Sequence, residues 1–351
     1  MNMIRKMIMK IGKFKKWYKK VWKAPNDFHI SWINRVKYAI HYFKPNECYW
    51  FDFEHNDYRD YISDFERVES RNINGDYKVI LDDKLLFCEV FKHYIRVPEI
   101  YAWICDEKVY GMNGYQISKD NFTSFIKEKK RVVLKWTRGY EGKGTYIIEF
   151  QDVFRINGEE VHEDDIINLL KFQGEAIFCE YMYQSDFENS LYPFSTNTLR
   201  IICAKKKDDI NAHIVAAVQR IGNEDSRPVD NVSAGALASD INLETGELNS
   251  AVIAKSHDEY ARSKTWDNHP DTGSQIKGLI IPNWERIKKQ IEELTNQFPF
   301  LNFIAWDVLL TKDGICVIEG NASAGVMMFQ VREGVRNKEI GNIYRSYGII
   351  K

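Results

Sequence analysis

Three oxygen-bearing side chains near the C-terminal end of the sequence have the types and spacing of a divalent-metal site. Asp307 lies in one apolar segment, and Glu319 and Asn321 lie two residues apart in the next, across a turn at residues 312–314. Residues two apart on a strand share a face, and a hairpin would set Asp307 opposite Glu319. Two carboxylates this close repel each other unless a cation neutralises them, and hard oxygen ligands suit Mg²⁺. The alternative is a pair of solvent-facing acids on an edge hairpin.

A second segment has the composition of a phosphate-binding loop. Residues 132–145 read as a strand that ends near Lys135, a glycine-rich turn and a second strand. The turn contains Gly139, Gly142, Lys143 and Gly144. Glycines let backbone N–H groups turn toward an anion, and Lys135 supplies a positive charge. It is not a Walker P-loop, because a strand follows it. Alone it could be an ordinary hairpin turn; with the acidic hairpin it favours phosphate and magnesium.

Taken in order, these segments and several others resemble the ATP-grasp superfamily. The resemblance is closest to its sugar-transfer-associated branch, related to alpha-L-glutamate ligases, and covers about residues 80–330. Its most specific part is the Asp–x11–Glu–x–Asn spacing at the C-terminal hairpin. The other matching pieces are Asp83-Lys84, Lys135 with its turn, Phe178 to Met182, Asn197 to Arg200, Asp230 to Gly235, His269 to Gly273 and Gly278 to Trp284.

The resemblance implies an α+β ATP-grasp fold, with two lobes of mainly antiparallel sheets around ATP and Mg²⁺, Mn²⁺ being an alternative ion. It implies metal ligation by Asp307, Glu319 and Asn321. The residues implied to bind the nucleotide are Lys84, Lys135, Gly139, Gly142, Lys143, Gly144, Glu180, Tyr181 and Met182. Those implied to face the phosphoryl acceptor are Arg200, Arg220 and Asn197. Each could instead be a solvated residue of a helix start or a strand.

ATP-grasp ligases are known to phosphorylate a carboxylate and to let an amine attack the acyl phosphate. Such chemistry needs positioning and charge neutralisation more than a protein nucleophile. We therefore expect an ADP-forming carboxylate–amine ligase, acting on a uronic acid or another carboxylate of a cell-surface polysaccharide such as a capsule. Two alternatives stay open: a kinase that phosphorylates a sugar, and a non-catalytic nucleotide-binding module of polysaccharide assembly. No Ser-His-Asp or Cys-His constellation argues for hydrolysis.

The elements that must position these residues mix helices and strands without strict alternation, which indicates an α+β class. Helices are expected at residues 84–93, 122–130, 164–172 and 283–297, and a loop-rich stretch at 222–282. Strands are expected at residues 131–135, 145–150, 176–181, 198–204, 212–220, 303–310 and 315–319. The expected units are a basic amphipathic helix (1–25), a helical N-terminal region (26–80), a small lobe with the glycine-rich loop (81–182) and a large lobe with the metal site (183–351).

Two departures from the family pattern concern the loop and the acceptor. Tyr140 and Glu141 stand where the family usually has a small residue. The chain before residue 80 is too short and too helical for the separate α/β domain that precedes many ATP-grasp cores. The place where the acceptor docks therefore stays open.

Residues 1–25 have a strongly biased charge. They contain nine basic residues and no acid, and apolar residues recur at helical spacing on one face. Lysines interrupt every candidate apolar core, so the segment is not a secretory signal. It is either a helix on an anionic membrane surface or an amphipathic helix packed on the body with solvated lysines. The complete sign bias favours the membrane surface.

The overall composition excludes several classes of protein. With 351 residues, 44% hydrophobic and 28% charged, the chain can bury a real core in two lobes. Six separated cysteines without a CxxC pair indicate reduced thiols, not a disulfide scaffold or a zinc site. Beyond residues 1–25 the sequence has no further stripe of basic residues, so it does not indicate a nucleic-acid partner. No apolar run reaches the roughly 18 residues of a spanning helix. We expect a cytoplasmic protein, peripheral on the inner face of the cell membrane.

Overall fold

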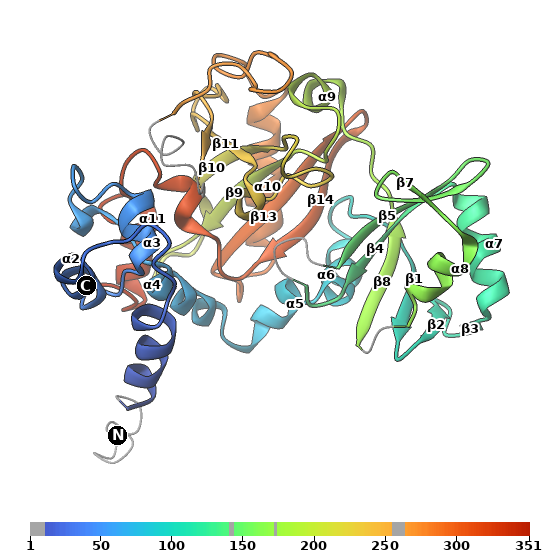
Figure 1. The fold of residues 1–351 in the computed structure, drawn as a ribbon, viewed down its shortest axis with the longest axis horizontal. Helices are drawn as coiled ribbons and strands as arrows, with labels where there is room; N and C mark the ends of the chain where they lie inside the picture. The colour runs from blue at the N-terminus through green and yellow to red at the C-terminus, as the bar shows by residue number, and fades with distance from the viewer. Residues whose placement is uncertain (1–10, 140–143, 172–173, 255–263) are drawn as a thin grey trace.

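The computed structural model describes residues 11–139, 144–171, 174–254 and 264–351. They form an eight-stranded sheet, a six-stranded sheet and an N-terminal helical region, which confirms the α+β class with mainly antiparallel sheets. Figure 1 shows the eight-stranded sheet at one end, the N-terminal region and the C-terminus at the other, and the six-stranded sheet between them. None of the described helices has the length and apolar character needed to cross a bilayer.

The N-terminal region consists of short helices. Residues 11–22 are helical and end in the π-helix η1 (Tyr18–Trp22). The others are α2 (Trp32–Ala39), α3 (Pro45–Trp50), η2 (Tyr58–Asp60), α4 (Asp64–Glu69), η3 (Ser70–Lys78) and α5 (Val79–Asp82). Ser31 and Ser63 cap α2 and α4 through their side-chain oxygens, and Pro45 begins α3. A buried aromatic cluster packs these helices: Tyr38, Phe43, Phe51, Phe53 and Tyr61.

The eight-stranded sheet has the order β3-β2-β1-β8-β4-β5-β6-β7. Its strands are β1 (Ile100–Cys105), β2 (Lys108–Gly111), β3 (Gln116–Ile117), β4 (Arg131–Trp136), β5 (Thr145–Phe150), β6 (Phe154–Ile156), β7 (Glu159–Val161) and β8 (Glu175–Glu180). Helices α7 (Lys119–Lys129) and α8 (Glu163–Asn168) cover one face, where Phe122, Ile126 and Ile166 join the core. The helix expected at 164–172, of which residue 172 lies outside the described residues, ends at Asn168, because the amides of Leu170 and Lys171 bond three residues back, in a tighter turn.

The six-stranded sheet has the order β12-β11-β10-β9-β13-β14. Its strands are β9 (Thr198–Ala204), β10 (His213–Ile221), β11 (Leu237–Asp240), β12 (Val252–Ile253), β13 (Phe303–Thr311) and β14 (Gly314–Asn321). The expected pairing of β9 with β10 is confirmed. The loop-rich stretch expected at 222–282 also contains β11 and β12, two short segments with little periodicity of their own; β11 is ordered by pairing with the edge of β10, and β12 by pairing with β11.

Helices cover both faces of the six-stranded sheet. On one face, α10 (Trp284–Asn296) packs Ile287, Ile291 and Leu294 against the sheet. On the other lie η5 (Val326–Phe329) and α11 (Glu339–Ser346). α9 (Asp186–Leu191) follows the eight-stranded sheet in the chain. α6 (Lys84–Phe91) lies between the two sheets, where Phe87 and Phe91 share one core with residues of both. α6 therefore packs against both sheets and holds them on either side of the space between them.

Candidate active site

One cavity of about 680 Å³ is bordered by both sheets and by the N-terminal region. Strands β4, β8, β9, β10, β13 and β14 all contribute lining residues. The sequence-predicted residues that line it are Lys84, Lys135, Gly139, Glu180, Tyr181, Met182, Arg200, Arg220, Asp307, Glu319 and Asn321. We call this cavity the cleft.

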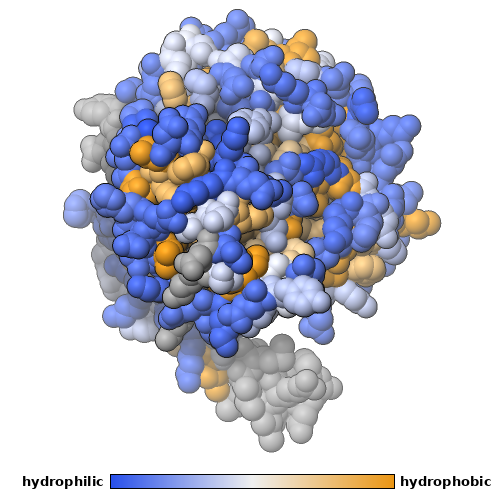
Figure 2. Space-filling view, turned by 90° about the vertical axis from the view of Figure 1, so that its right-hand side faces the viewer, coloured by the Kyte–Doolittle hydropathy of each residue, from blue (hydrophilic) through white to orange (hydrophobic). Residues whose placement is uncertain are grey.

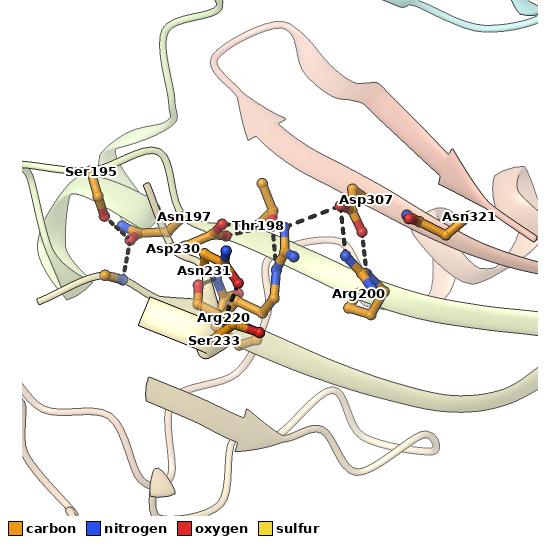
Figure 3. A network of polar contacts seen from close by, with 12 residues as sticks. Ser195, Asn197, Thr198, Arg200, Arg220, Asp230, Asn231, Ser233, Asp307 and Asn321 are labelled. Carbon is orange, nitrogen blue, oxygen red and sulfur yellow. Dashed lines mark hydrogen bonds and ion pairs between the residues drawn. The ribbon is translucent and has the colours of Figure 1, made fainter. Parts of the chain in front are cut away.

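The β13–β14 hairpin brings the three expected metal ligands together. Its register pairs Asp307 with Glu319 and Ala305 with Asn321, close to the opposed placement that the sequence indicated; counted from the turn alone, Asp307 would pair with Ile318. A register shift follows Asp307, and such a bulge changes the direction of the strand's side chains. Asp307 is buried, whereas Glu319 and Asn321 are only partly covered. Figure 3 shows the Asn321 amide turned toward Asp307.

Two arginines neutralise Asp307. The Arg200 guanidinium lies side-on to the carboxylate, with Nε on Oδ1 and Nη2 at 2.9 Å from Oδ2. Arg220 Nη2 donates to Oδ2 at 3.2 Å (Figure 3). Burial alone would raise the pKa of Asp307, but the two arginines outweigh it and hold that pKa below its ordinary value. Asp307 is therefore ionised at neutral pH.

Arg220 also joins a second buried carboxylate to the same network. Its Nη2 lies 3.2 Å from Asp230 Oδ1 and 2.5 Å from Thr198 Oγ1, and Thr198 donates to Asp230 Oδ2 at 2.5 Å. Burial raises the pKa of Asp230 despite the attraction of Arg220. The opposite balance holds for Arg220, where Asp230 and Asp307 outweigh burial and raise the pKa. The sequence showed Asp230 only as part of a motif, with no role; the structure places it in the cleft.

Lys84 links the acidic hairpin to the glycine-rich turn. Its Nζ lies 3.1 Å from the carbonyl oxygen of Gly139 and 3.3 Å from Glu319 Oε1. Asp83 caps α6 by accepting from the Leu85 and Leu86 amides, and its second oxygen accepts from Arg138 Nε at 2.9 Å. The start of α6 is thus bound to the turn, and the Lys84 ammonium is held where phosphate charge would develop.

The glycine-rich turn lies only partly within the described residues. Lys135 pairs with Thr145 at the mouth of the β4–β5 hairpin, and both line the cleft. Gly139 lines it as well, whereas Gly142 and Lys143 fall outside the described residues. Gly144 has φ +72°, and a Cβ there would lie 2.2 Å from the Trp136 ring. Glycine is therefore required at 144 by close packing as well as by backbone conformation.

Glu180 ends β8 and is held by a partner that the sequence did not reveal. Arg96 Nη2 lies 2.6 Å and 2.5 Å from its two carboxylate oxygens, and the Glu99 amide donates to it at 3.2 Å. The next ring, Tyr181, lies 3.7 Å below the Arg131 guanidinium. These contacts fix the backbone of the segment that was expected to bind adenine.

Asn197 does not line the cleft, contrary to the catalytic role expected for it. The cleft-lining residues 196, 198 and 200 share one face of the strand, and Asn197 points to the other. It is fully buried there, donates to the carbonyls of Glu188 and Tyr192, and accepts from the Gly222 amide. Asn197 therefore braces the approach to β9. Strand alternation counted from Arg200 could have indicated this from the sequence.

The N-terminal region adds a second set of charges to the cleft, and sequence reasoning assigned none of them. Asp64 Oδ2 lies 2.5 Å from Lys44 Nζ, and its Oδ1 accepts from Arg67 Nε at 2.8 Å. Arg67 Nη1 also donates to Ser323 Oγ at 2.9 Å. Beside them Glu47 is buried and accepts from the amides of Lys44 and Asp64. Burial and the nearby Asp64 charge raise the pKa of Glu47 to about 7.

The residues at the hairpin fit a divalent cation by their chemistry. Asp307 and Glu319 supply four carboxylate oxygens: Asp307 Oδ2 accepts from both arginines, whereas Asp307 Oδ1 and Glu319 Oε1 each accept one hydrogen bond and keep a lone pair for a cation. The Asn321 amide group donates from Nδ2 to the Ala305 carbonyl at 3.5 Å, a contact that does not involve its oxygen. Carboxylate and amide oxygens are ligands for Mg²⁺ or Mn²⁺. In the structure Arg200 and Arg220 pair with Asp307, and Lys84 pairs with Glu319. These three side chains supply the neutralising positive charge that two neighbouring carboxylates need.

An antiparallel α+β body with a glycine-rich hairpin, a lysine at the start of α6 and an Asp/Glu/Asn hairpin defines an ATP-grasp protein. The family model described as "Sugar-transfer associated ATP-grasp" matches residues 66–343, and the chain belongs to this family. A comparison with curated proteins finds no match.

Solved structures of ATP-grasp enzymes are similar at low identity. D-alanyl-alanine synthetase A from Vibrio cholerae O1 biovar eltor has 12% identity and a TM-score of 0.43, over 76% of this chain and 66% of that chain. The ATP-grasp ligase PsnB, complexed with minimal precursor, Mg and ADP, has 12% identity and a TM-score of 0.38, over 78% and 60%. The N5-carboxyaminoimidazole ribonucleotide synthetase purK, as its ADP complex, has 11% and 0.40, over 70% and 45%. The chain thus spans less than two thirds of the length of each of these proteins. TM-scores this low carry no argument about activity.

Proposed function

We propose that the protein is an ATP- and Mg²⁺-dependent carboxylate–amine ligase that forms ADP and works through an acyl phosphate. The observation that carries the proposal is the convergence of Asp307, Glu319 and Asn321 with Arg200 and Arg220 in one cleft. Membership of a family named for association with sugar transfer supports a carbohydrate-linked acceptor. The carboxylate of a uronic acid in a cell-surface polysaccharide fits this role, with an amino acid or another amine as the nucleophile.

The nucleotide would lie between the two sheets. Lys84 and Lys135 line the cleft from the side of the glycine-rich turn, where their charges can offset those of the phosphates. Glu180, fixed by Arg96, holds the segment of Tyr181 and Met182, which line the cleft and would contact the purine. Mg²⁺ held by Asp307, Glu319 and Asn321 would neutralise phosphate charge during transfer.

Arg200 and Arg220 would act where the phosphoryl group leaves the nucleotide for its acceptor. Arg200 and Arg220 are buried, and their geometry is set by Asp307, Asp230 and Thr198 before any substrate binds. Preorganised cations need little rearrangement when charge develops on a transferred phosphoryl group. We assign them to the carboxylate that receives the phosphoryl group. No covalent protein nucleophile is required for such a transfer.

The N-terminal region would supply the acceptor side. Lys44 and Arg67 line the same cleft as Arg200, and their two positive charges face the charge of Asp64 and that of Glu47, whose raised pKa of about 7 reduces its negative charge near neutral pH. An anionic acceptor is therefore favoured over a neutral or cationic one. A cytoplasmic enzyme peripheral to the membrane would meet lipid-linked polysaccharide intermediates at the membrane surface.

The test is ADP release by the full chain with ATP, Mg²⁺ and a panel of carboxylates, including uronic acids, in the presence of an amine or of hydroxylamine. The proposal predicts ADP formation that depends on the carboxylate, and a hydroxamate when hydroxylamine is the nucleophile. Phosphate found on a sugar hydroxyl would make the protein a kinase. Absence of ADP with every pair, from protein that binds ATP, would contradict catalysis.

A further inference from the structure

Two helices at the N-terminal end expose large apolar side chains on the outside of the protein. On the helix of residues 11–22, Ile11, Phe14 and Tyr18 recur on one face, and Phe14 is 61% exposed. On α2, Trp32 is 66%, Ile33 77% and Ile40 64% exposed. We name this surface the two-helix apolar patch; it consists of Ile11, Phe14, Tyr18, Trp32, Ile33, Val36 and Ile40.

A row of aromatic rings joins the two helices into one surface. The Phe14 and Trp17 ring centroids lie 5.5 Å apart, Trp17 and Trp22 6.1 Å, and Trp22 and Trp32 5.2 Å. The inner side of the same helix is bound to the body: Val21 is fully buried, and Trp17 Nε1 donates to the Ala39 carbonyl at 2.7 Å. The patch is therefore held in place by its own inner contacts. The inner face of the helix is thus packed on the body, and its outer face stays exposed.

Positive charge surrounds the patch. Between residues 11 and 46 the sequence has one acid, Asp27, and nine basic residues: Lys13, Lys15, Lys16, Lys19, Lys20, Lys23, Arg35, Lys37 and Lys44. Within the part of the chain that the structure describes, Lys15, Lys19 and Lys20 are exposed and form no ion pair. Lysine ammonium groups around exposed Trp, Phe and Ile side chains complement anionic headgroups above an acyl layer.

We propose that the two-helix apolar patch docks on the surface of an anionic lipid bilayer. Trp32, Ile33 and Ile40 enter the interface, and the surrounding lysines contact the headgroups. Soluble monomers rarely expose so many large apolar side chains together, which calls for a partner. A bilayer fits better than a second copy of the chain, because two copies of this face would bring their lysines together.

The opposite end of the molecule provides a contrast. Figure 1 shows the helix of residues 11–22 projecting from the body, with α2 at the same end. The end that carries the eight-stranded sheet is largely hydrophilic in Figure 2, with hydrophobic side chains in small groups. The cleft does not include the patch residues. Docking would therefore leave the chemistry of the cleft unchanged.

The test uses sedimentation of the full chain with vesicles of phosphatidylglycerol and phosphatidylcholine, and with vesicles of phosphatidylcholine alone. We expect binding to the anionic vesicles that falls as salt rises, and at least about tenfold weaker binding for the double variant W32S/I33S. The triple variant K15Q/K19Q/K20Q should lose most of the difference between the two kinds of vesicle. The matched controls are Ile210→Ser, 86% exposed, and Lys289→Gln on α10, and both should bind like wild type.

Three results would overturn the proposal: wild type that stays in solution with anionic vesicles, a W32S/I33S variant that binds like wild type, or equal binding to neutral vesicles. A dimer in light scattering that W32S/I33S dissociates, without vesicle binding, would identify the patch as a self-contact. Thermal unfolding and ATP binding of each variant are measured in parallel. They separate a failure of docking from a failure of the proposed ligase activity.

Discussion

The cleft has two charged walls that are built in different ways. On the six-stranded sheet, Arg200, Arg220 and Asp307 are almost wholly buried, and each has partners on neighbouring strands. On the N-terminal helices, Lys44, Asp64 and Arg67 keep between a fifth and a third of their side chains exposed. The first wall is fixed by sheet register, the second by short capped helices. A rigid wall suits phosphoryl transfer, where the positions of the charges decide the rate, and a more exposed wall suits recognition of an acceptor.

The largest effect is expected at the rigid wall, from Asp307→Asn. The variant leaves Arg200 and Arg220 buried with less neutralising charge and removes an expected metal ligand. We predict a fall in the rate of ADP release of about 10²-fold or more, and a loss of about 3–5 kcal/mol in the free energy of unfolding. Steady-state kinetics and denaturant unfolding measure the two effects. Asp313→Asn, in the exposed turn of the same hairpin, should change neither; wild-type rates in Asp307→Asn would contradict the assigned role.

A smaller and more selective effect is expected from Arg67→Ala, at the more exposed wall on the N-terminal helices. In the proposed function Arg67 would contact the acceptor and not the nucleotide, so its removal should raise the KM for the carboxylate about tenfold. The KM for ATP should stay the same. Arg71→Ala is the matched control, because Arg71 pairs with Asp82 nearby but does not line the cleft. An equal rise in both KM values would show that the two walls do not divide the substrates as we propose.

The smallest effect is a pH dependence that comes from Glu47. Burial raises its pKa to about 7 in the folded protein from the ordinary 4.5 of a glutamate, so the folded state holds this proton more tightly than the unfolded state. The stabilisation is complete below pH 4.5 and is lost as pH rises to about 7. Glu47→Gln, which does not titrate, should gain stability relative to wild type across that interval. Unfolding at pH 5 and pH 8 measures this, and a constant difference would mean that Glu47 titrates normally.

The sequence was sufficient for features that depend on local spacing. The β13–β14 turn brings the two acidic segments together, so the nearness of Asp307 and Glu319 could be predicted, whereas their direct pairing depends on a register shift after Asp307 that the sequence did not show. The β9–β10 pairing follows from two adjacent alternating strands. Strands β2, β3, β6, β7, β11 and β12 were not predicted, because each has only two to four residues and is ordered by its neighbours.

Contacts between distant parts of the chain could not be predicted in this way. Arg96 and Glu180 are 84 residues apart, and Arg67 and Ser323 256 residues apart, and no local pattern connects either pair. The second wall was therefore missed entirely. Asn197 shows the reverse case, since its place in a motif suggested a role in the cleft, whereas the alternation of the strand places its side chain on the other face. The roles of the remaining site residues stay predictions until they are measured.

The central claim is that Asp307, Glu319 and Asn321 hold a divalent ion beside the nucleotide. The most direct measurement is electron paramagnetic resonance of Mn²⁺ titrated into the protein with and without ADP, for wild type and Glu319→Gln. Glu319 is partly exposed, so the variant should fold. The account predicts bound Mn²⁺ that requires ADP in wild type and is at least about tenfold weaker in the variant. Mn²⁺ binding that is equally tight in Glu319→Gln, or that does not respond to ADP, would contradict it.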